Sequence, residues 1–203
     1  MLASITPVGE SARRQPWIVT VTAYLAGSAA GGAAVGVVAG AIGAVLGAGG
    51  WGVPGLVLLG VVAVLGAVSD ARRRGAAAPS WRRQVDERWL TTYRGWVYGA
   101  GYGLQLGAGV VTIVPSAVTY VALLAAVLTG SPVVGAVIGV VFGVVRALPV
   151  LVAGVLREGH QLQRLHRRLD AVRRPVGHAS VGAQFVVGTL VLAVATVSTA
   201  VPT

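Results

Sequence analysis

Residues 135–154 read GAVIGVVFGVVRALPVLVAG, an apolar run in which Arg146 is the one charged side chain. A guanidinium stays protonated and offers its N–H donors in a planar fork, so it binds anions and does not act as an acid or base. Arg146 lies about ten residues from the cytoplasmic end of its apolar run, or about 15 Å of helix. A charge at that depth in a bilayer costs about 2.5 to 3.5 kcal/mol, so we expect Arg146 to face a bundle interior or a water-filled cavity.

No carboxylate lies inside an apolar run, because the six acidic residues are confined to the N-terminal head and two charged segments. The candidate partners of Arg146 are therefore hydroxyls, amides, and the carbonyls that Pro115 and Pro149 leave without a helical donor. Arg146 then caps broken backbone, contacts an anionic substrate or lipid headgroup, or lies at another depth than the apolar run suggests. The candidate substrate-binding residues are Arg146, Gln105, Thr112, Pro115, Ser116 and Thr119.

The other reactive side chains form no catalytic or metal-binding pattern. The chain has no cysteine, which excludes disulfides and thiolate sites. The spacing of His160, His166 and His178 matches no compact set of metal ligands, and Ser116 and Thr119 have no base within the spans. We therefore expect no enzymatic activity, no metal and no cofactor.

The amino-acid composition indicates which class of protein contains Arg146. Charged residues make up 11% of the 203 residues, against about 25% in soluble domains. They are segregated between long uncharged stretches, a layout typical of multi-pass membrane proteins. The sequence therefore predicts an all-α integral protein of the cell membrane.

The alternation of charged and uncharged stretches predicts how the chain is divided into segments. The sequence AGGWGVP at 48–54 predicts a turn within the uncharged residues 17–69, and Pro115 predicts a kink or a discontinuous helix within 96–129. In order, the segments are a cytoplasmic head (1–16), a transmembrane hairpin (17–69), a basic connector (70–95), a broken helix followed by the Arg146 span (96–155), a second basic connector (156–178), and a last transmembrane helix with its tail (179–203).

The arginines predict the topology. Residues 70–94 hold seven arginines and residues 157–174 hold six, so both connectors should be cytoplasmic. If residues 96–129 cross the membrane once, the two connectors lie on the same side of it. This arrangement predicts about five transmembrane helices, with a broken third span and a cytoplasmic N-terminus. Both connectors mix arginine with apolar residues at helical spacing, as interfacial amphipathic helices do. We expect them to bind anionic lipid headgroups or a cytoplasmic partner, and not nucleic acid, because they adjoin the bilayer.

Glycines recur at every fourth position, a spacing that lets helix backbones approach closely in lipid. These faces predict either packing within the chain or a homo-oligomer. The four sets are Gly27 and Gly31; Gly32, Gly36 and Gly40; Gly99, Gly103 and Gly107; and Gly135, Gly139 and Gly143.

Residues 99–154 contain GAGYGLQLGAGVVTIVPSAVTY, a short polar turn, and GVVFGVVRALPVLVAG. This order resembles the second half of the CcdA/DsbD transmembrane family, which is related to the LysE-type exporters. The resemblance implies a glycine-rich helix broken at Pro115, followed by a second membrane helix. The family passes electrons through a cysteine pair, and no residue here matches those cysteines, so that activity is not implied for this chain.

Two functions remain after these considerations. The first is a small-anion transporter or channel-like permease, in which Arg146 and the break at Pro115 line a polar path. The alternative is a non-transporting membrane subunit or scaffold that binds anionic lipid or a cytoplasmic partner through its arginine-rich connectors. The arginine within a span favours the first function, and the scarcity of other polar groups in the spans favours the second.

Overall fold

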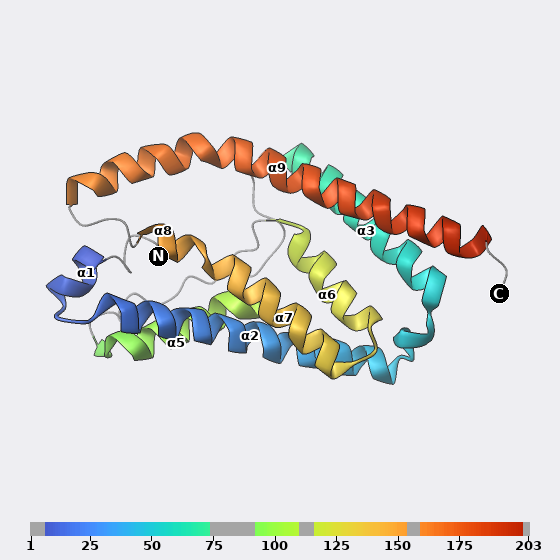
Figure 1. The fold of residues 1–203 in the computed structure, drawn as a ribbon, viewed down its shortest axis with the longest axis horizontal. Coiled ribbons are helices and arrows are strands. Elements are labelled where there is room, and N and C mark those ends of the chain that lie inside the picture. The colour runs from blue at the N-terminus through green and yellow to red at the C-terminus, as the bar shows by residue number, and fades with distance from the viewer. Residues whose placement is uncertain (1–6, 74–91, 110–115, 154–158, 201–203) are drawn as a thin grey trace.

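The computed structural model describes residues 7–73, 92–109, 116–153 and 159–200, and these residues form helices joined by short turns (Figure 1). For residues 152–153 and 159–176 the structure describes the backbone and not the side chains. The elements are α1 (Pro7–Ala12), α2 (Trp17–Val45), the short 3-10 helix η1 (Ala48–Gly50), α3 (Gly52–Arg73), α5 (Gly95–Ala108), α6 (Val118–Leu128), α7 (Pro132–Ala147), α8 (Pro149–Ala153) and α9 (Gly159–Ala200). The predicted all-α class is confirmed for these residues.

Four helical segments are long and apolar enough to cross a membrane, namely Trp17–Val45, Gly52–Arg73, Pro132–Leu151 and Gly177–Thr199. Helices α5 and α6 have 14 and 11 residues, so each is shorter than the roughly 20 residues that a crossing needs. Helix α5 ends before Gly109, whose positive φ of 69° suits a residue without a side chain. The helix is therefore discontinuous between Ala108 and Val118, and Pro115 itself lies outside the described residues.

Helix α2 is the axis of the fold, because its glycine face touches the backbone of α7 directly. A Cβ atom added at Gly32 would overlap the carbonyl oxygen of Gly139, and one added at Gly36 would overlap that of Gly135. Residue numbers rise along α2 while those of its partners fall, so the two helices are antiparallel. At the same interface the Ser28 hydroxyl donates a 2.8 Å hydrogen bond to the Gly143 carbonyl.

Helices α5 and α6 follow α2 in the same direction. Along α5, Gly99, Gly103 and Gly107 contact the backbone of Thr20, Tyr24 and Ser28 in ascending order, so α5 is parallel to α2. Farther along α2, Gly43 contacts the backbone of Val127 in α6. The two short helices together therefore accompany α2 over most of its length (Figure 1).

Different helix ends and turns lie at the two ends of the molecule (Figure 1). One end, called here the head end, holds α1, the starts of α2, α5 and α9, and α8. The opposite end, called here the turn end, holds η1, the turn between α6 and α7, and the end of α9. At the turn end, Gly130 lies directly against Gly49, which brings the two turns together.

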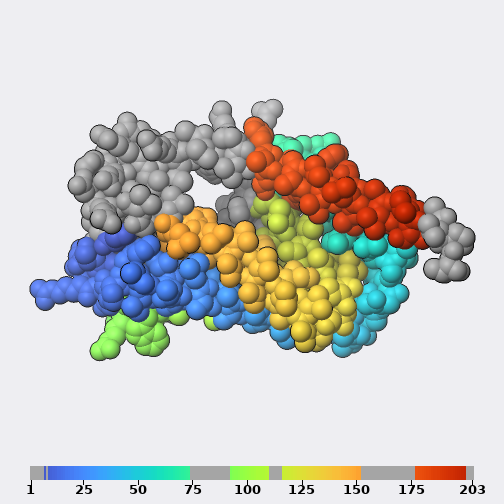
Figure 2. All heavy atoms as spheres, in the orientation of Figure 1, coloured from blue at the N-terminus to red at the C-terminus, as the bar shows by residue number. Residues whose placement is uncertain are grey.

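Helices α3 and α9 form a second antiparallel pair, in which Gly60 packs against Gly188 and Leu192. The pair contacts the other helices chiefly through α6, and Figure 2 shows α9 lying along α3 while α7 lies along α2. Helix α9 has 42 residues, about 63 Å of helix, and passes residue 178 without a break. The predicted connector (156–178), from residue 159 onward, is continuous with the predicted last helix, because Arg, Leu and Gln make up most of residues 159–174 and favour helix. The candidate membrane span within α9 is Gly177–Thr199.

The glycine faces predicted from the sequence are buried between helices of the same chain. Gly27 and Gly31 contact the backbone of Ala100 and Leu104 in α5, and the glycines of α7 contact α2. Packing within the chain thus accounts for these faces, and a homo-oligomer stays a prediction.

We predict that Gly36→Ala lowers the midpoint of thermal unfolding in detergent, followed by circular dichroism. Its new methyl group would collide with the Gly135 backbone, and overpacking of this kind costs about 1 to 3 kcal/mol. Gly182→Ala is the matched control, since nothing lies within 4 Å of a Cβ added at that helical glycine. Equal midpoints for the two variants would contradict the close contact between α2 and α7.

Candidate functional site

Arg146 lies in the last turn of α7, which ends at Ala147 because Pro149 cannot donate a backbone hydrogen bond. The Leu148 amide donates to the carbonyls of Val144 and Val145 instead, at 3.1 and 3.3 Å. Five residues separate Arg146 from Leu151, where this candidate span ends, which is about 7.5 Å of helix. The depth of Arg146 in a bilayer stays a prediction, and a positive charge in the last turn of α7 interacts favourably with the helix dipole.

The guanidinium of Arg146 is half-buried and folds back along its own helix. Its central carbon lies 5.8 Å from the ring centroid of Phe142, one turn earlier, in a cation–π arrangement. Arg146 also interacts electrostatically with Tyr24 of α2. The side chain is thus held at a defined place, from which it can bind an anion but cannot exchange protons.

An open groove runs between α6 and α7, with Arg146 at one end. It encloses about 470 Å³, and Val137, Val141 and Val145 on its α7 wall are exposed. Arg146 is the one charged residue of its lining. The lining residues are Val118, Ala122, Val137, Ile138, Val141, Phe142, Val145 and Arg146.

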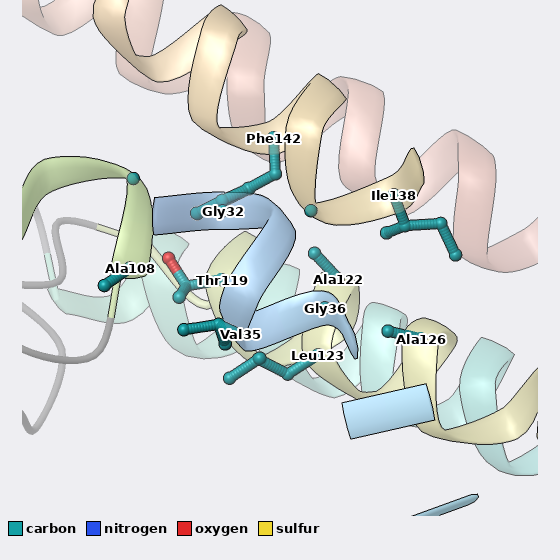
Figure 3. Close-up of a pocket in the computed structure, with 12 residues that line it drawn as sticks. Gly32, Val35, Gly36, Ala108, Thr119, Ala122, Leu123, Ala126, Ile138 and Phe142 are labelled. Carbon is teal, nitrogen blue, oxygen red and sulfur yellow. The ribbon is translucent and has the colours of Figure 1, made fainter. Parts of the chain in front are cut away.

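A separate internal cavity of about 20 Å³ lies where α2, α5, α6 and α7 meet (Figure 3). The buried hydroxyl of Thr119 is the polar side-chain group on its wall, among glycine, alanine and larger apolar residues. Phe142 lines both this cavity and the groove. The cavity has room for about one water molecule.

The structure disperses the substrate-binding residues predicted from the sequence. Arg146 lines the groove, Thr119 lines the internal cavity, and Gln105 is half-buried on α5. The Ser116 hydroxyl donates a hydrogen bond to Asp70 of α3, away from the groove and the cavity linings. Thr112 and Pro115 lie outside the described residues.

Asp70 is a structural residue that the sequence analysis assigned to the first connector. It lies in α3, and its Oδ2 accepts 2.7 and 2.8 Å hydrogen bonds from the Ser116 hydroxyl and the Ala117 amide. A carboxylate at this position satisfies donors at the start of α6 and interacts favourably with its dipole. Sequence reasoning missed this contact because the two residues are separated by 46 positions.

Glu10 organises a polar cluster at the head end, and it is fully buried. Its carboxylate accepts hydrogen bonds from Arg13 at 2.7 Å, from the Thr20 hydroxyl at 2.8 Å, and from the buried Tyr98 hydroxyl at 2.5 Å. The spacing of Glu10 and Arg13 is the signal available in the sequence, and it indicates an ion pair but not the contact with α5. These bonds hold α1 onto α2 and α5.

Arg13 stays protonated in the Glu10 cluster. Burial lowers the pKa of Arg13, but the hydrogen bond that Arg13 donates to Glu10 and the charge interactions with Tyr98 and Glu10 outweigh burial and raise this pKa above its ordinary value. Because the donors of Arg13, Thr20 and Tyr98 all converge on Glu10, this cluster holds α1 in place and is not a ligand site. It is called here the Glu10 latch. In the described part of the chain, no three His, Asp or Glu side chains could hold a metal ion.

We predict that Glu10→Gln and Tyr98→Phe each destabilise the protein by about 1 to 3 kcal/mol in thermal unfolding, since each leaves buried polar groups incompletely paired. The double variant should lose less than the two single losses together, because both act on the same bond. Arg14→Gln, at an exposed position beside Arg13, is the control and should leave the midpoint near that of the parent. Strictly additive losses would contradict the latch.

Comparisons of this chain with protein-family models, with curated proteins and with solved structures find no match. The resemblance of residues 99–154 to the CcdA/DsbD family is therefore an expectation that depends on the sequence alone.

Proposed function

We propose that this chain is a multi-pass membrane protein that does not transport solutes, and that serves as a membrane subunit or scaffold binding anionic lipid on one side. The observation that carries the proposal is the backbone contact of α2 with both α5 and α7. Glycine faces in direct contact leave no room for a water-filled path along these two interfaces. The internal cavity beside them has room for about one water molecule.

In this proposal the chain crosses the cell membrane five times, with the head end cytoplasmic. Supporting it, α5 and α6 follow α2 in one direction, so together they can complete one crossing although each is too short alone. The segment after α3 and the segment before α9 then lie on the same side. The arginine excess of both segments assigns that side to the cytoplasm.

The arginines supply the lipid affinity in this proposal. The chain has a formal net charge of +10, and thirteen of its sixteen arginines lie in residues 70–94 and 157–174. An anionic leaflet attracts each nearby basic side chain by about 1 kcal/mol. An anionic lipid surface is therefore a stronger partner for these arginine-rich segments than a neutral bilayer.

Transport of a small anion is the second candidate, and the break between Ala108 and Val118 favours it. Broken helices within a bilayer expose backbone groups that can bind a solute. The polar path of this candidate would include Arg146.

We predict that the purified chain, reconstituted into vesicles, releases trapped chloride no faster than protein-free vesicles do. Chloride release above that background that is lost in Arg146→Gln would contradict the proposal and establish the transporter.

We also predict that anionic phospholipid raises the midpoint of thermal unfolding in nanodiscs, and that added salt reverses the gain by screening. Replacing the α9 arginines with glutamine should reduce the gain, and Arg14→Gln should not. An equal midpoint in anionic and zwitterionic lipid would refute lipid binding. The α9 arginines are Arg164, Arg167, Arg168, Arg173 and Arg174.

A further inference from the structure

The groove between α6 and α7 has the length of one leaflet. Along α7, nine residues separate Val137 from Arg146, which is about 13.5 Å of helix. The hydrocarbon core of a bilayer is about 30 Å thick, so each leaflet contributes about 15 Å. The groove is thus nearly as long as one leaflet of the hydrocarbon core is deep.

The groove also has a defined direction along the helix bundle. Its Val137 end lies near Gly139, which contacts Gly32 close to the middle of α2. Its Arg146 end lies toward the head end, where α7 is followed by α8. The groove therefore runs from the middle of α2 toward the head end, and Arg146 lies about 7.5 Å inside the end of the candidate span Pro132–Leu151.

The chemistry of the groove is apolar along its walls and cationic at one end. Valine, alanine, isoleucine and phenylalanine line it up to Arg146. A planar guanidinium matches the oxygens of a phosphate group, and the contact with Phe142 holds it at the groove. A ligand complementary to this arrangement has a long apolar tail and an anionic head.

We infer that the groove binds one anionic phospholipid, whose acyl chain lies between α6 and α7 and whose phosphate pairs with Arg146. This inference rests on the proposed function, and it adds a defined lipid site to the diffuse attraction of the arginine-rich segments. The Arg146 side chain that the sequence singled out then contacts a lipid headgroup and not a transported solute.

The test measures how many phospholipid molecules stay bound to the full-length chain in native mass spectrometry, with phosphatidylglycerol as the anionic probe and phosphatidylcholine as the zwitterionic one. The parent should retain one phosphatidylglycerol in preference to phosphatidylcholine. Arg146→Gln should weaken that binding about tenfold or more, the effect of losing a charged hydrogen bond, and Arg146→Lys should weaken it less.

A second pair of variants tests the groove itself. Val141→Trp fills the groove and should abolish retention of the bound lipid, whereas Val133→Trp changes a 74% exposed residue of the same helix that does not line the groove. Val133→Trp should bind phosphatidylglycerol like the parent. It also controls for the effect of a large side chain on folding, which the thermal midpoint checks in each variant.

Two results separate this inference from the proposed function. If Arg146→Gln and Val141→Trp retain phosphatidylglycerol like the parent, the groove site is refuted, while the gain in stability from anionic nanodiscs can still stand. If the parent shows neither a retained phosphatidylglycerol nor a gain in stability from anionic lipid, both the site and the proposed function are refuted.

Discussion

The contact between the glycine face of α2 and the backbones of α5 and α7 is the constraint on which the rest of the structure depends. Within a bilayer, lipid tails are as apolar as leucine, so helices gain little from burying apolar side chains against one another. Close backbone approach supplies van der Waals packing and Cα–H···O contacts instead. Each of these contacts needs a residue without a Cβ, as at Gly32 against Gly139.

This contact fixes the register of the helices, and the register positions the polar residues. With α5 parallel to α2, Tyr98 comes beside Glu10 and Thr20 at the head end. With α7 antiparallel to α2, the Ser28 hydroxyl meets the Gly143 carbonyl, and Arg146 comes within electrostatic reach of Tyr24. The face of α2 from Gly32 to Gly40 is closed by glycine against the backbone of α7 and of the residue before it. This closure is why we favour binding at the membrane surface over passage through the bundle.

Much of the fold could be predicted from the sequence because it depends on local patterns of charge, glycine and proline. The uncharged runs predicted the hairpin of α2 and α3, and Pro115 predicted an interruption between α5 and α6. The buried Glu10 latch and the Asp70 cap could not be predicted, since each joins residues that only the register brings together. The depth of Arg146 in a bilayer stays a prediction, because the candidate span Pro132–Leu151 follows from helix length and composition alone. The change in charge that separates the predicted connector from the last span lies near the start of the candidate span Gly177–Thr199, and α9 is one helix through both.

The sidedness of single cysteines, introduced into a chain that has none of its own, tests most directly the register of α5 and α6 along α2. Thr92→Cys precedes α5, His178→Cys precedes the apolar part of α9, and Gly50→Cys lies in the turn after α2; all three positions are exposed. If α5 and α6 make one crossing, a membrane-impermeant thiol reagent should label residues 92 and 178 from the same side and residue 50 from the other. Labelling of residues 92 and 178 from opposite sides would mean that residues 95–128 cross twice, and it would contradict the parallel packing of α5 and α6 along α2.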